Sequence, residues 1–278
     1  MGFGAGRIGG DDISDAEADA LVRRALDLGV TLLDSARSYG RSEERLGRAL
    51  RGERGRVVLS TKVGYGIPGH EDWTGPCVSA GVDAALGRLG TDVLDVVHLH
   101  SCPLDVLRRG DVVEALAGAV RSGKVRVAAY SGEGEALAWA VASGVFGSVQ
   151  LSVNACDQRA LSTAVAEAAR RGLGVLAKRP LANAPWRFAA RPAGDDAEPY
   201  WERLQAMGLD PGGLPWEELF LRFAAFAPGV SSALVGTRSA AHLEAAVRAA
   251  EKGPLPAELA GSLRAAFQRA DAGWTGRI

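Results

Sequence analysis

The chain has 278 residues, a length that suits one large α/β barrel or two ordinary domains. Apolar residues make up 47% of it, enough for a large core, and the formal net charge of -1 gives no reason to expect binding to nucleic acid or to an anionic membrane. We therefore expect small-molecule partners.

No apolar run approaches the roughly 18 residues of a membrane span, and no basic start followed by an apolar stretch indicates a signal peptide. We expect a cytoplasmic protein. Cys77, Cys102 and Cys156 are widely spaced and odd in number, which suits neither a disulfide framework nor a zinc site. We predict reduced thiols and no metal site.

Short apolar runs alternate with amphipathic patterns of helical period along the chain. The predicted strands cover 2–10 (with a turn), 31–34, 56–63, 93–100, 125–131, 148–154, 173–178 and 232–235. The predicted helices run from the Ser14 cap to about 28, from a capped start at Ser42, over 79–89, up to a Gly123 cap, and over 134–142, 160–171, 216–226 and 239–250, with an added C-terminal helix over 256–271.

Eight such units with short connections favour a closed parallel (β/α)8 TIM barrel, formed as a single domain by residues 1–278, over an open doubly wound sheet. The regular alternation stops over 179–215, where prolines, glycines, Trp186 and Trp201 form an insertion. Insertions of this length in a compact domain are usually functional loops.

Polar residues gather where the predicted strands end, and the carboxyl ends of the strands are where such barrels build their sites. Both His98 and His100 fall on one face of the fourth strand, so alternation does not choose between them. The strand-end residues, in chain order, are Asp34 with Tyr39 just beyond it, Lys62, His98 or His100, Ser131, Gln150 and Lys178.

Four of these residues suit protonation of a carbonyl oxygen. A phenol is a weak acid, with a reference pKa of about 10, and a nearby ammonium group favours its ionised form. Lys62 is placed to act on Tyr39 in this way, and Asp34 would keep the lysine charged. A histidine could hydrogen-bond the substrate oxygen while hydride reaches the carbon.

The chain resembles the aldo-keto reductases over nearly its whole length. The residues that carry the resemblance are Leu33-Asp34-Ser-Ala-x-x-Tyr39-Gly40-x-Ser-Glu, the Lys62 of Ser-Thr-Lys, His100 five residues after Asp95, Gly123-Lys-Val-Arg before Ser131, Gln150, and Gly236-Thr-Arg-Ser-x-x-His-Leu243. The resemblance implies that Asp34, Tyr39, Lys62 and His100 form the catalytic tetrad, with Tyr39 as the general acid.

The same resemblance implies the cofactor site. Ser131 and Gln150 match positions that hold the nicotinamide carboxamide, and Lys178 lies where many members stack an aromatic ring on the nicotinamide. The positions around the adenosine 2′-phosphate correspond to Gly236, Thr237, Arg238 and His242. The stretch from Gly236 to Ser239 also lies between a strand and a helix, where backbone amides favour a phosphate, and Arg238 adds a charge. We therefore predict NADPH.

The leading hypothesis is an NADPH-dependent oxidoreductase that reduces an aldehyde or ketone, with a sugar-like compound as one candidate substrate, to an alcohol. One alternative keeps the barrel and uses Lys178 with the tetrad for redox-neutral elimination or epimerisation. Another is a nucleotide-binding regulatory subunit with little turnover. The sequence does not indicate the oligomeric state.

Overall fold

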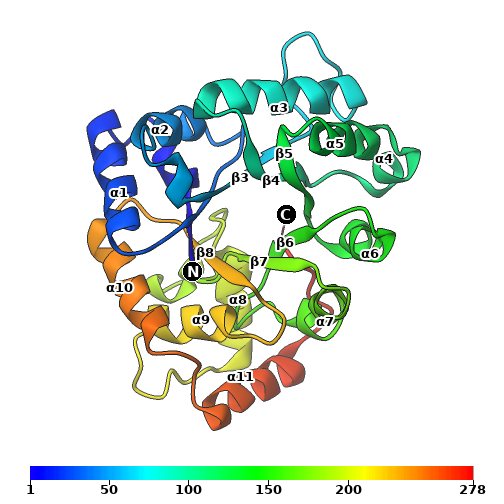
Figure 1. The fold of residues 1–278 in the computed structure, drawn as a ribbon. Helices are drawn as coiled ribbons and strands as arrows, with labels where there is room; N and C mark the ends of the chain where they lie inside the picture. The colour runs from blue at the N-terminus through cyan, green and yellow to red at the C-terminus, as the bar shows by residue number, and fades with distance from the viewer. Residues whose placement is uncertain (278) are drawn as a thin grey trace.

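The computed structural model describes residues 1–277, and at its centre eight parallel strands close into a barrel in the order of the chain, from β1 to β8 (Figure 1). The predicted barrel is confirmed. The strands are β1 (Gly2–Gly4), β2 (Leu32–Asp34), β3 (Val58–Val63), β4 (Leu94–His100), β5 (Val125–Ser131), β6 (Ser148–Ser152), β7 (Gly174–Lys178) and β8 (Ser232–Val235).

Six strands end at the predicted residues, and two stop earlier than predicted. After β1 the chain forms the 3-10 helix η1 (Ala5–Ile8) in place of a longer strand. β6 stops at Ser152 because Asn154 turns the chain: its side-chain oxygen accepts a hydrogen bond from the Cys156 amide, which satisfies a backbone group outside the sheet.

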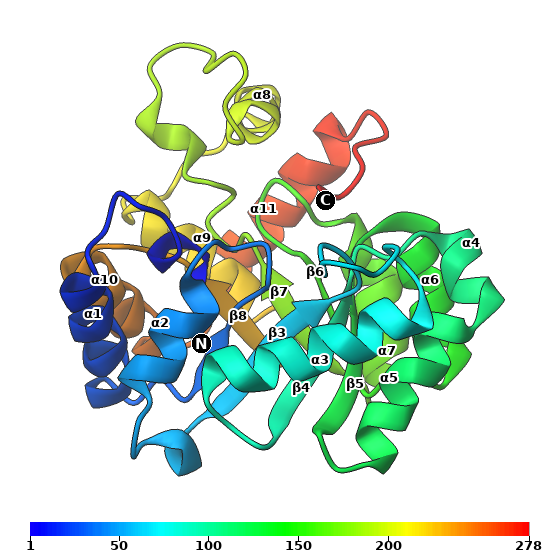
Figure 2. The same cartoon turned by 90° about the horizontal axis from the view of Figure 1, so that it is seen from above.

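The helices surround the barrel, and Figure 2 shows α8 and the C-terminal end of the chain projecting on the same side of it. Their bounds are α1 (Asp15–Asp27), α2 (Ser42–Ala49), α3 (Gly75–Leu89), α4 (Leu104–Arg109), α5 (Asp111–Arg121), α6 (Gly134–Ser143), α7 (Ala164–Arg170), α8 (Glu198–Met207), α9 (Trp216–Ala225), α10 (Ala240–Glu251) and α11 (Ala257–Ala270), with further 3-10 turns η2 (Arg54–Arg56), η3 (Arg159–Ser162) and η4 (Pro185–Arg187). No helix within residues 1–277 has the length and apolar character needed to cross a membrane.

Several helix predictions need correction. α3 starts at Gly75, before the predicted 79, because the Thr74 side chain caps it and Pro76 fits its first turn. The predicted helix 160–171 divides into η3 and α7. Helix α4 was not predicted, and the insertion 179–215 contains η4 and α8.

The predicted side-chain cap at Ser42 is also wrong, although α2 does start there. Arg41 occupies the N-cap position without a side-chain hydrogen bond. The Ser42 hydroxyl instead donates to the Ala5 carbonyl oxygen and lies 2.8 Å from the Ser35 hydroxyl. A contact with a segment 37 residues earlier therefore takes the place of local capping.

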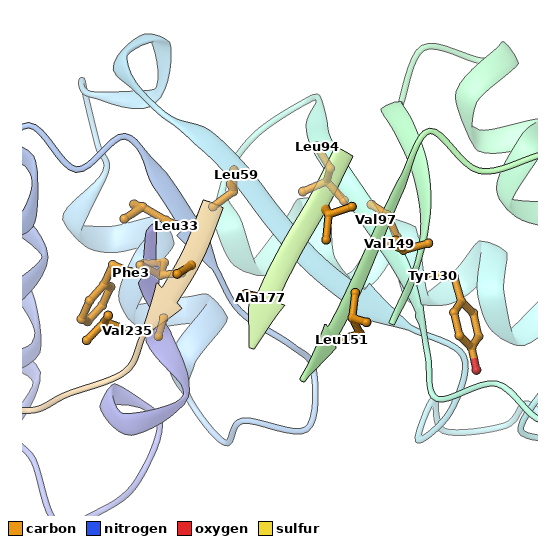
Figure 3. Packing of buried hydrophobic residues seen from close by; sticks show 14 of the residues in the cluster. Phe3, Leu33, Leu59, Leu94, Val97, Tyr130, Val149, Leu151, Ala177 and Val235 are labelled. Atoms are coloured by element: carbon orange, nitrogen blue, oxygen red, sulfur yellow. The ribbon is translucent and has the colours of Figure 1, made fainter. Parts of the chain in front are cut away.

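The main apolar cluster joins the strands to the surrounding helices. Phe3, Leu33 and Leu59 of the strands belong to the same buried cluster as Leu46 of α2 and Val82 of α3 (Figure 3). Burying such side chains stabilises each by roughly 1.5–3 kcal/mol relative to exposure. The strand ends are thus fixed by packing all around the barrel.

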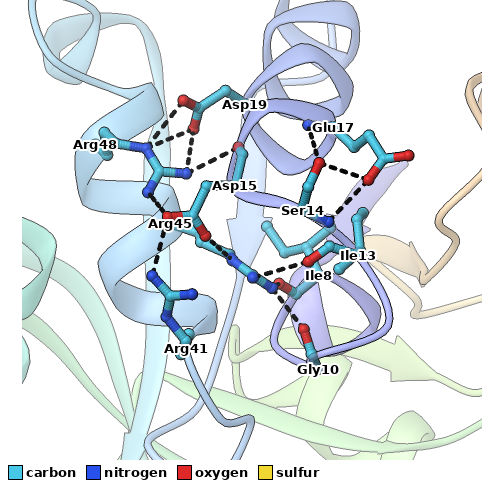
Figure 4. A network of polar contacts seen from close by, with 10 residues as sticks. All are labelled: Ile8, Gly10, Ile13, Ser14, Asp15, Glu17, Asp19, Arg41, Arg45 and Arg48. Carbon is cyan, nitrogen blue, oxygen red and sulfur yellow. Dashed lines mark hydrogen bonds and ion pairs between the residues drawn. The ribbon is translucent and has the colours of Figure 1, made fainter.

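A polar network fastens the chain around η1 to α1 and α2 (Figure 4). The Arg45 side chain is 2% exposed and donates hydrogen bonds to the carbonyl oxygens of Ile8, Gly10 and Ile13. Asp15 accepts a hydrogen bond from Arg45 on Oδ1. Its Oδ2 accepts from Arg48 of α2 and from Arg41 at the N-cap of that helix. This network holds the segment against which the loop between β2 and α2 packs.

Candidate active site

A buried ion pair lies at the ends of β2 and β3. The Lys62 ammonium donates to Asp34 Oδ2 at 2.5 Å and to the Ser35 carbonyl oxygen at 2.7 Å. In the sheet register Asp34 pairs with Ser60, so Lys62, two residues farther along β3, lies on the same face. The predicted approach of these two side chains is confirmed, and Asp34 and Lys62 are 3% and 1% exposed.

The pair is charged despite its burial. Burial alone would raise the pKa of Asp34, but the charges of Lys62 and His98 and the hydrogen bonds from Lys62 and Ser60 bring it below its usual value. Burial alone would lower the pKa of Lys62, but Asp34 and then Tyr39 raise it. An ammonium group is therefore held beside the Tyr39 phenol.

Tyr39 reaches the mouth of the barrel from the loop between β2 and α2. The centre of its ring lies 5.0 Å from Lys62 Nζ. The loop fits closely against η1: a Cβ at Gly9 would lie 1.7 Å from the Tyr39 carbonyl oxygen, and the Arg41 amide donates to the Gly9 carbonyl. Glycine at position 9 therefore permits the approach that places Tyr39.

Of the two histidines on β4, His100 lies next to Tyr39. Their rings meet edge to face with centroids 6.1 Å apart. Burial, followed by the charge of Lys62, lowers the pKa of His100 to about 3, so the imidazole is neutral at ordinary pH. His98 is fully buried, its Nε2 lies 3.1 Å from the Ser60 hydroxyl, and burial lowers its pKa to about 4.

One aromatic residue at this site has no signal in the sequence. The Tyr65 hydroxyl lies 2.9 Å from His100 Nδ1, and the two rings stack with centroids 5.6 Å apart. Tyr65 sits in the irregular loop after β3, where an aromatic residue has no periodic pattern to mark it.

Ser131 and Gln150, predicted to bind the nicotinamide, are joined to the ion pair. The Ser131 hydroxyl donates to Gln150 Oε1 at 3.1 Å, and Gln150 Nε2 donates to Asp34 Oδ1 at 3.0 Å. Because the serine hydroxyl is the donor in this bond, it keeps lone pairs with which to accept from an amide.

Lys178 lies at the end of β7 and pairs with Glu133, 3.2 Å away. Burial lowers the pKa of Lys178 and raises that of Glu133, so here desolvation outweighs attraction. The C-terminal segment covers this side: the Arg277 carbonyl oxygen accepts hydrogen bonds from Arg179 and Ser152.

The remaining predicted cofactor residues follow β8. Thr237 Oγ1 accepts from the Ser239 amide, and Ser239 caps α10 by accepting from the His242 amide. Arg238 is half exposed and forms an ion pair with Asp12, in the segment after η1. Gly236 begins this loop at the end of β8, and β8 is separated in the barrel from β2, which carries Asp34, by β1.

Comparison with known proteins gives the family. The family model described as "Aldo/keto reductase family" matches residues 1–267. The match to an aldo-keto reductase of Bacillus halodurans in its holo form covers 98% of this chain and 92% of that protein. The TM-score of 0.82 at 24% identity shows a likeness of fold. A putative aldo-keto reductase of Pseudomonas aeruginosa covers 94% and 89%, with a TM-score of 0.71 and 29% identity.

Curated proteins match over shorter stretches. L-glyceraldehyde 3-phosphate reductase of Escherichia coli K12 is 34% identical over 137 residues, 41% of this chain and 37% of that protein. 6-dehydroglucose reductase of Novosphingobium aromaticivorans is 33% identical over 142 residues, 47% and 46% of the two chains. A probable voltage-gated potassium channel subunit beta of Arabidopsis thaliana is 35% identical over 107 residues, 36% and 33%. The chain spans less than half the length of each.

Proposed function

The chain belongs to the aldo/keto reductase family, a family of oxidoreductases, and from that premise we propose that it is an NADPH-dependent reductase of a small aldehyde or ketone. The observation that carries the proposal is the buried, charged Asp34–Lys62 pair beside Tyr39 and His100. We assign these four residues as the catalytic tetrad.

The proposed chemistry places an acid and a hydrogen-bond donor on one oxygen atom. Tyr39 protonates the carbonyl oxygen, and the Lys62 ammonium stabilises the phenolate that forms. Asp34 holds that ammonium charged and in place, because its carboxylate accepts from Lys62 and from the Ser60 hydroxyl. His100, neutral at ordinary pH, shares in binding the oxygen.

A nicotinamide nucleotide supplies the hydride when bound, and the donor set of this chain fits one. Ser131 and Gln150 provide a hydroxyl and an amide next to Asp34 for the carboxamide, with Lys178 close by. The loop from Gly236 to Ser239 precedes α10, whose N-terminal amides favour a phosphate, and His242 lies in the first turn of that helix. Arg238 and Thr237 add a guanidinium and a hydroxyl, which favour the 2′-phosphate of NADPH.

The substrate class we propose is a small, sugar-like carbonyl compound. Two relatives that match this chain are named for the reduction of L-glyceraldehyde 3-phosphate and of 6-dehydroglucose. The insertion 179–215 and the loop 64–74 stand near the strand ends and are the segments we expect to select the substrate.

A second candidate is a nucleotide-binding subunit with little turnover. The match to a potassium channel subunit beta favours it. Consumption of the cofactor separates the two candidates, because a regulatory subunit binds the nucleotide without a stoichiometric loss of NADPH.

The proposal predicts that the purified protein consumes NADPH with at least one compound in a panel of small aldehydes, ketones and sugar-like carbonyls. Tyr39→Phe removes the proposed acid and should lower kcat by about 10²- to 10⁴-fold. Tyr200→Phe, which removes a buried hydroxyl that donates to Asp157 from α8, is the matched control. Equal activity in the wild type and Tyr39→Phe would contradict the assignment.

A further inference from the structure

Tyr65 makes a directed contact with the imidazole of His100, in addition to packing on it. Its hydroxyl lies 2.9 Å from Nδ1, within the normal range of a hydrogen bond, and the two ring planes are inclined by 23°. The contact therefore involves one particular nitrogen of the ring, and the other nitrogen, Nε2, is left for another partner.

The chemistry of the two groups decides which one donates. A phenol is a stronger acid than a neutral imidazole N–H, and an imidazole nitrogen lone pair is a stronger base than a phenol oxygen. The hydrogen bond is therefore strongest when Tyr65 donates its O–H to a bare Nδ1. In the neutral ring the proton then resides on Nε2, because the hydrogen bond at one nitrogen fixes the tautomer at the other.

The loop after β3 is built to hold Tyr65 in this position. Gly64 has φ +134°, and a Cβ there would lie 2.2 Å from the Trp73 ring. The Trp73 amide donates to the Gly64 carbonyl oxygen at 2.7 Å, and the Trp73 ring packs against Tyr65 with centroids 5.4 Å apart. Arg109 of α4 donates to the Trp73 carbonyl oxygen, which ties the loop to a neighbouring unit.

We propose that Tyr65 is a positioning residue that holds His100 in the neutral tautomer with the proton on Nε2, so that this N–H donates to the substrate carbonyl oxygen. The inference rests on the proposed function for the role of His100. The stack fixes the ring plane and the hydroxyl fixes the tautomer. Without the hydroxyl, the tautomer with a bare Nε2 also forms, and its lone pair repels a carbonyl oxygen.

The experiment uses Tyr65→Phe, which keeps the stacked ring and removes the hydroxyl. Tyr200→Phe is the control that loses a tyrosine hydroxyl elsewhere. The first readout is the ¹⁵N–¹H correlation spectrum of the imidazoles in the free protein, with His100→Gln used to assign the His100 signals. We expect the wild type and the control to show protonated Nε2, and Tyr65→Phe to show a mixture of both tautomers.

The second readout is kinetic. In Tyr65→Phe we expect kcat to fall about tenfold, as for loss of one hydrogen bond that acts in the transition state. The dissociation constant of NADPH should stay at the wild-type value, because His100 contacts the carbonyl oxygen and not the nucleotide. A residue with a merely structural role would not change the tautomer.

Either of two results overturns the inference: wild-type His100 with its proton on Nδ1, or Tyr65→Phe with an unchanged tautomer and unchanged kcat. Failure of the proposed function is a different result. A wild-type protein that reduces no carbonyl compound would refute the reductase, while the imidazole spectrum would still decide whether Tyr65 sets the tautomer.

Discussion

Each side of the barrel mouth holds a buried ion pair, and the pKa values of the two pairs are shifted in opposite directions. On the tetrad side, at the ends of β2 to β4, attraction outweighs burial, and the pKa of Lys62 is raised while that of Asp34 is lowered. On the cofactor side, at the ends of β5 to β8 where we propose that the nucleotide binds, burial outweighs attraction, and the pKa of Lys178 is lowered while that of Glu133 is raised.

The difference comes from the number of partners. The Asp34 carboxylate accepts from Lys62, Ser60 and Gln150, so it gains several hydrogen bonds in its charged form. The Glu133 carboxylate accepts from the Ser152 amide and pairs with Lys178 at 3.2 Å, while a neighbouring arginine opposes the charge of Lys178. The Asp34–Lys62 pair is thus stabilised by more hydrogen bonds within the chain than the Lys178–Glu133 pair. We expect substitutions to affect the two sides unequally.

The largest effect is expected for Lys62→Met. It leaves Asp34 buried without its counter-ion, which typically costs about 3–5 kcal/mol in the free energy of unfolding. Chemical denaturation at pH 7 measures this loss, and the variant should also lack activity because the phenol loses its ammonium neighbour.

Lys178→Met is the matched control on the cofactor side. Desolvation already destabilises the charged form of the Lys178 ammonium, so its removal costs little stability. Glu133 can then take up a proton and become neutral. The variant should therefore lose less than half as much stability as Lys62→Met. Equal losses would show that the two pairs do not differ.

A smaller effect is expected at Arg238. Arg238→Gln removes a charge-assisted contact worth about 1.5–3 kcal/mol, so the dissociation constant of NADPH should rise about 10- to 100-fold. That of NADH should stay near the wild-type value. Titration of tryptophan fluorescence with both nucleotides measures the two constants, and an equal change for both would remove Arg238 from the 2′-phosphate site.

The smallest effect is expected from pH. Burial and Lys62 lower the pKa of His100 to about 3, so its imidazole is neutral, with a single ring proton, at every pH well above 3 and stays neutral as the pH falls from 8 to 5. The kcat profile over this range should lack a step caused by His100. His70→Gln, a variant in an exposed loop, is the control. A step near pH 6 that persists in His70→Gln and disappears when His100 is substituted would contradict the neutral imidazole.

Sequence patterns predict the barrel, the ends of every strand except β1 and β6, and the approach of Asp34 to Lys62, because all three depend on local periodicity and parallel register. They fail where distant segments decide. Ser42 bonds to Ala5 in place of capping its own helix, and α8 forms within a stretch that prolines and glycines mark as irregular. The contact of Tyr65 with His100 depends on the course of a loop, which the sequence does not specify.

The central claim is that hydride passes from NADPH to a carbonyl carbon at this mouth. The direct measurement is mass spectrometry of the product formed with NADPH carrying two deuterium atoms at C4 of the nicotinamide. The account predicts an alcohol with one deuterium on the former carbonyl carbon and one NADPH consumed for each molecule formed. A product without deuterium, with NADPH left intact, would contradict it.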